Sequence, residues 1–73
     1  MPSQIKIVSV PVGMTTRVTG FVGTNEVISL NNGVADVWRV SGRSCLPSDL
    51  QEAALYLECM QRCFARAREH GAT

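Results

Sequence analysis

Hydrophobic and polar positions in this chain follow two different periods, one before residue 41 and another after residue 48. In the first part, short β-branched runs alternate with turn-forming residues, which predicts β-strands. The expected strands are Ile5–Val10, Thr16–Val22, Glu26–Leu30 and Ala35–Val40. An Asn-Gly pair at 32–33 separates the last two, and this dipeptide favours a tight hairpin because both residues tolerate positive φ. We therefore expect a small antiparallel sheet of three or four strands.

A helical period follows a connector over residues 41–48. Apolar residues recur at intervals of three and four, as on one side of an amphipathic helix from about residue 49 to about residue 70. They are Leu50, Ala53, Leu57, Met60, Phe64 and Ala67. Ser48 and Gln51 have the spacing of a capping box, with Asp49 in the first turn. The pattern predicts an α+β fold in which residues 1–73 form one domain and this stripe packs on one face of the sheet.

Composition and charge exclude some classes of function. The 73 residues carry a net charge of +1, whereas dedicated nucleic-acid binders usually show a stronger basic bias. We expect nucleic acid only as a secondary contact, through Arg62, Arg66 and Arg68. No apolar run approaches the ~20 residues that span a bilayer, and no leader pattern opens the chain. Three cysteines are an odd count, which argues against a disulfide framework. These features favour a cytoplasmic protein without membrane contact.

Cys59, Cys63 and His70 fall within roughly 40° of one another on a helical wheel, and Cys45 could reach them from the connector. Such ligands suit zinc, but structural zinc sites usually take paired ligands from turns. His70 is also two helical turns from Cys63, too far for a catalytic Cys–His pair. We therefore expect no metal, no cofactor and no enzymatic activity. Cys63 is expected at the core edge, and Cys59 in a more exposed position.

The strands hold more apolar side chains than one helix can cover. The set expected to face the helix is Ile5, Ile7, Val18, Val22, Ile28, Leu30 and Val37. The opposite face then keeps Val8, Val10, Phe21, Val27, Trp38 and Val40, bordered by Lys6, Arg17 and Asp36. An exposed apolar patch with a central aromatic residue and a nearby arginine is typical of protein-binding surfaces.

A partner-binding surface is accordingly predicted at Val8, Val10, Arg17, Phe21 and Trp38. Three alternatives stay open. The sheet could curl into a half-barrel that buries both faces, the apolar face could form a homodimer, or the strand at 5–10 could pair with the sheet edge of another protein.

Over its full length the chain resembles the small transcription regulators of lytic Xanthomonas phages. The likeness lies in the size, the opening MPSQIKIVSVPVG, the strands through NNGVADVWRV and the closing helix SDLQEAALYLECMQRC. It implies a non-enzymatic protein that binds bacterial RNA polymerase in the host cytoplasm. The residues do not fix the oligomeric state, and a monomer is expected. Such a regulator inhibits initiation by interfering with the sigma factor and promotes terminator read-through. The alternatives are a nucleic-acid binder that uses the C-terminal arginines and a dimeric accessory protein.

Overall fold

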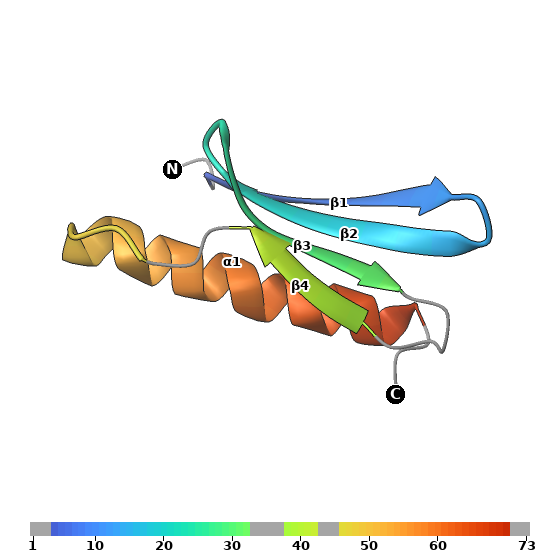
Figure 1. The fold of residues 1–73 in the computed structure, drawn as a ribbon. Helices are drawn as coiled ribbons and strands as arrows, with labels where there is room; N and C mark the ends of the chain where they lie inside the picture. Colours follow the sequence, from blue (N-terminus) through green and yellow to red (C-terminus); the bar gives the residue numbers. More distant parts are fainter. Residues whose placement is uncertain (1–3, 33–37, 43–45, 71–73) are drawn as a thin grey trace.

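The computed structural model describes residues 4–32, 38–42 and 46–70, and of residues 38–40 it describes the backbone alone. These residues form the strands β1 (Ile5–Val12), β2 (Thr15–Val22), β3 (Asn25–Asn32) and β4 (Trp38–Gly42), followed by helix α1 (Leu50–Glu69). The strands make one antiparallel sheet in the order β1-β2-β3-β4. Helix α1 covers one face of this sheet (Figure 1). The predicted α+β fold is confirmed; the Asn-Gly turn itself lies outside the described residues.

Tight turns join the first three strands. The register of the flanking strands leaves two residues in each turn, and the first of them is Gly13 at φ 62° or Gly23 at φ 63°. Two-residue hairpins require positive φ at this position, which glycine adopts without strain. Strand β1 also continues past its predicted end at Val10, through Pro11 to Val12. Proline is tolerated there because β1 is an edge strand, which does not need every backbone N–H for pairing.

A β-bulge interrupts the regular pairing of β2 with β3. Gly20 pairs with Ile28, whereas Phe21 pairs with Glu26, so Val27 is an extra residue between them. Val27 is buried in the core, although strict alternation predicted it on the face away from the helix. That prediction is wrong because the extra residue shifts the inward and outward alternation of β3 at this point.

Helix α1 is rotated relative to the orientation that its apolar stripe predicted, so that only one edge of the stripe, with Ala67 buried and Met60 packed against the core, meets the sheet. The buried residues of α1 are Tyr56, Cys59, Cys63 and Ala67. Leu50, Leu57 and Phe64 belong to the predicted stripe, yet 86%, 49% and 40% of their surfaces are exposed. For these three residues the predicted packing on the sheet is wrong.

Gly20, near the middle of β2, explains the orientation of the helix. A Cβ atom at this position would lie 2.6 Å from the Cys59 sulfur and still closer to the Cys63 sulfur. The helix therefore approaches the strand so closely that only small side chains fit between them. Two cysteines occupy this contact, and the larger Leu57 and Phe64, which are partly exposed, lie to one side of it. The core comprises Val18, Val22, Val27, Ile28, Leu30, Tyr56, Cys59, Cys63 and Ala67.

The helix begins with Asp49 as its N-cap, one residue after the predicted cap at Ser48. The Asp49 carboxylate accepts hydrogen bonds from the backbone N–H of Gln51 at 2.8 Å and of Glu52 at 3.4 Å. An aspartate is as good a cap as a serine, and its charge also suits the positive end of the helix dipole.

Of the observed cap Asp49 and the predicted cap Ser48, only Asp49 should affect the stability of the fold when it is replaced. Asp49→Ala is expected to lower the free energy of unfolding by about 1 kcal/mol, because two backbone N–H groups lose their acceptor. Ser48→Ala is the matched control and should change it by less than about 0.5 kcal/mol. Urea denaturation of both variants measures the difference. Equal losses would contradict the assignment of Asp49 as the cap.

Candidate functional site

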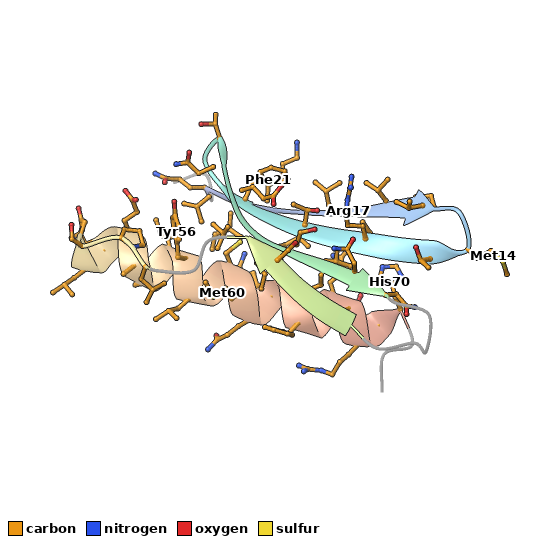
Figure 2. The ribbon with its side chains drawn as sticks, viewed as in Figure 1. Met14, Arg17, Phe21, Tyr56, Met60 and His70 are labelled. Atoms are coloured by element: carbon orange, nitrogen blue, oxygen red, sulfur yellow. The ribbon has the colours of Figure 1, made fainter. Side chains whose placement is uncertain are left out.

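The sheet face away from α1 carries the predicted binding residues of β1 and β2. Gly20 faces the helix, so its neighbour Phe21 points to the opposite side. Residues paired directly across strands share a face. The pairs on this side are Lys6 with Phe21, Val8 with Thr19, and Val10 with Arg17. Figure 2 shows Phe21 and Arg17 on the side of the sheet away from the helix.

We call Lys6, Val8, Val10, Arg17 and Phe21 the open sheet face. Its two cationic side chains are exposed, and its three apolar side chains are partly exposed. Because Arg17 and Phe21 are four residues apart on β2, the cations stand at opposite ends of the apolar group, roughly 13 Å apart along the strand. This face is therefore an apolar strip between two positive charges. Lys6 and Arg17 of this face are exposed, whereas Thr19 and Ser29, on the same side of the sheet, are buried.

A short ladder of hydroxyl groups borders the apolar strip. The Thr19 and Ser29 hydroxyls are 3.4 Å apart and both residues are buried, and Ser41 donates to the Ser29 carbonyl at 3.3 Å. These three small side chains carry no charge and no large apolar group. The bond of Thr19 to Ser29 depends on the register of β2 with β3, which the sequence pattern does not specify.

Trp38 was predicted to belong to the same surface. It lies in β4, where its backbone pairs with Asn32, and β3 separates it from β2. Its side chain lies outside the described part of the chain, as do Asp36, Val37 and the side chain of Val40. The role of Trp38 therefore stays a prediction, and the open sheet face is defined without it.

The two helix cysteines are core residues. Cys59 and Cys63 have 0% exposed surface, so the expectation that Cys59 is the more exposed is wrong. Cys59 donates a weak hydrogen bond from its Sγ to the Phe21 carbonyl at 3.7 Å. Burial raises the pKa of the Cys59 thiol, and burial together with the neighbouring Cys59 raises the pKa of Cys63 to about 12. Both groups are neutral thiols at physiological pH, the form that neither attacks substrates nor binds metals well.

His70 does not join these cysteines. Its Nε2 lies 3.2 Å from the Ser9 hydroxyl, at the far end of the helix contact with β1 (Figure 2). Among the described residues no group of three His, Cys, Asp or Glu side chains could hold a metal ion, and no pocket is present. Cys45 lies outside the described residues. The predicted absence of a metal site remains a prediction for the chain as a whole.

The arginines considered for nucleic-acid contact have acidic neighbours on the helix. Arg62 forms an ion pair with Glu58, as its i,i+4 spacing predicts. The Nε of Arg66 lies 3.4 Å from an Oε of Glu69. These pairs reduce the net positive charge that a phosphate backbone would meet on this side of α1.

Comparisons with known proteins give no family assignment. No protein-family model matches the chain, and neither a curated protein nor a solved structure is similar enough to be matched to it. In the residues that the structure describes, no helix is both long enough and apolar enough to pass through a membrane.

Proposed function

We propose that this protein is a non-enzymatic regulator that binds bacterial RNA polymerase through its open sheet face. One observation supports a binding role above all: Val8, Val10 and Phe21 keep exposed surface on the face that α1 leaves uncovered. Burying such side chains against a partner is favourable by about 25 cal/mol for each Å² removed from water.

The charges of this face point to an acidic partner surface. Lys6 and Arg17 stand at the two ends of the apolar strip, and among the described residues Glu26, which pairs with Phe21, is an acidic neighbour. Complementary charges at the rim of an interface speed association and fix orientation, while the apolar centre supplies affinity. A partner is expected to present an apolar groove with carboxylates on both sides.

RNA polymerase is proposed as the partner because of the sequence resemblance to small phage regulators. Acting in the host cytoplasm, the bound protein would occupy a site that the sigma factor needs and so inhibit initiation. Staying bound during elongation, it would favour read-through at terminators. A rigid domain of this size acts by steric exclusion, which requires no catalytic group.

Two substitutions on the open sheet face should separate binding from folding. Phe21→Ala and Arg17→Ala are each expected to weaken binding to purified bacterial RNA polymerase by at least about tenfold, since aromatic and arginine residues dominate hot spots. Arg62→Ala is the matched control, because it removes an arginine from the outer side of α1. Binding is measured by fluorescence anisotropy, and folding by circular dichroism.

Several outcomes would contradict the proposal. If the wild-type protein does not bind the polymerase, the target is wrong. If it binds and Phe21→Ala and Arg17→Ala bind as tightly as Arg62→Ala, the surface is wrong. Salt separates the proposal from the nucleic-acid alternative, since affinity for a phosphate backbone falls steeply between about 50 and 200 mM salt.

A further inference from the structure

Strand β1 forms one edge of the sheet, and every second residue of it turns its backbone polar groups away from β2 (Figure 1). Among the described strands β1 pairs with β2 alone. Val12 and Thr15 flank a two-residue turn, where paired residues exchange both backbone hydrogen bonds. Such bonded pairs alternate with unbonded pairs along an antiparallel ladder. The outward-pointing backbone groups in the middle and at the end of β1 are therefore those of Ile7, Ser9 and Pro11.

An edge of this kind can serve as a template for a second chain. Strand β1 is eight residues long and rich in β-branched side chains, and Lys6 is its single charged residue. A second copy of the protein presents the same edge, so two copies could join their β1 strands in one antiparallel pair. Long apolar edge strands associate in this way unless features of the strand oppose it.

We propose that Pro11 and Lys6 keep β1 from pairing with the β1 strand of a second copy. Pro11 occupies an outward position and has no N–H. A strand laid along β1 therefore finds donors at Ile7 and Ser9 but none at Pro11. The ladder with β2 loses nothing, because β2 does not use the backbone groups at this position. A proline one residue earlier or later would instead remove a hydrogen bond to β2.

Lys6 opposes the same contact through its charge. Its side chain is exposed on the open sheet face, on the strand that a second copy would join. A β1–β1 pair would merge two open sheet faces into one surface that carries Lys6 and Arg17 of both copies. Like charges on one face repel, and a lysine beside an added strand loses part of its hydration. Lysine and proline on an edge strand are among the features by which natural sheets avoid edge-to-edge association.

Two double variants test the proposal. Lys6→Thr/Pro11→Thr removes both features, and threonine suits an exposed strand position. The matched control, Arg17→Thr/Val12→Thr, removes the same charge from the same face and adds a threonine next to Pro11. It leaves the edge unchanged, because Arg17 lies in β2 and the backbone groups of Val12 point to β2. All four positions are exposed, so circular dichroism should show that both variants are folded.

Amide hydrogen exchange, followed by NMR at about 20 μM and about 1 mM protein, measures pairing at the edge itself. In the wild-type protein and the control, the N–H groups of Ile7 and Ser9 should exchange equally fast at both concentrations, because the β1–β2 ladder does not bond them. In Lys6→Thr/Pro11→Thr their exchange should slow at least about tenfold at the higher concentration, because these groups become bonded to a second copy. Pro11→Thr alone should change exchange in the same direction.

Two results would overturn the proposal. In the first, the Ile7 and Ser9 amides of Lys6→Thr/Pro11→Thr exchange as they do in the control, which would mean that Lys6 and Pro11 do not limit pairing at this edge. In the second, these amides become protected with rising concentration in the wild-type protein, which would mean that β1 pairs with a second copy despite both residues. Neither result depends on RNA polymerase, so the outcome is independent of the proposed function.

Discussion

Gly20→Ala should lower the free energy of unfolding by about 1–3 kcal/mol, although alanine normally stabilises a strand relative to glycine. The added methyl group would overlap the sulfur atoms of Cys59 and Cys63, since a Cβ at this position lies 2.6 Å or less from each. Neither sulfur can move away easily, because both side chains are buried between α1 and β2. The helix would have to shift outward along its whole contact with the sheet.

A background without the sulfur atoms of Cys59 and Cys63 provides the control. In a Cys59→Ala/Cys63→Ala background the added methyl group has room, so Gly20→Ala should be neutral or stabilising by up to about 1 kcal/mol. Urea denaturation of all four proteins, in a fixed concentration of a stabilising osmolyte, gives the coupling energy. An equal loss in both backgrounds would mean that the conformational preference of Gly20, rather than the close approach of the helix, determines the effect.

Periodicity predicted the elements of the fold but not the rotation of the helix. An apolar stripe shows that a helix is amphipathic, and the residues of α1 form an arc broad enough to offer two contact sides. The side that faces the sheet is decided by Gly20, which accepts small side chains and excludes Leu57 and Phe64. This choice depends on a residue 39 positions from Cys59 in the sequence, so a local pattern does not contain it.

Strand alternation was informative where the register is regular. Between β1 and β2 no residue is inserted, and Val8, Val10, Arg17 and Phe21 lie on the face where alternation placed them. Their part in binding stays a prediction. Alternation failed at Val27 because the bulge inserts one extra residue into β3 and shifts which residues point toward the helix. A bulge depends on how two strands pair, and neither strand reveals it alone.

Raising the pH from about 8 to about 10.5 should lower the free energy of unfolding by about 2 kcal/mol through Cys63 alone. Burial raises the pKa of this thiol from 9.0 to about 12 in the folded protein. At pH 10.5 the unfolded chain therefore releases a proton that the folded chain still holds, which favours unfolding. The stabilisation is complete below pH 9 and is lost progressively as the pH rises toward 12. Burial raises the pKa of Cys59 as well, so its contribution has the same sign.

A Cys63→Ala variant isolates this contribution from those of the other titrating groups. Urea midpoints at several pH values between about 8 and 10.5 should fall more steeply for the wild-type protein than for the variant. The variant starts from a lower stability because alanine leaves part of the cysteine volume empty, but only the slopes are compared. The same burial predicts that thiol reagents label Cys63 in the wild-type protein only after unfolding. Parallel slopes, or rapid labelling of Cys63 in the folded protein, would show that α1 does not seal this cysteine against β2.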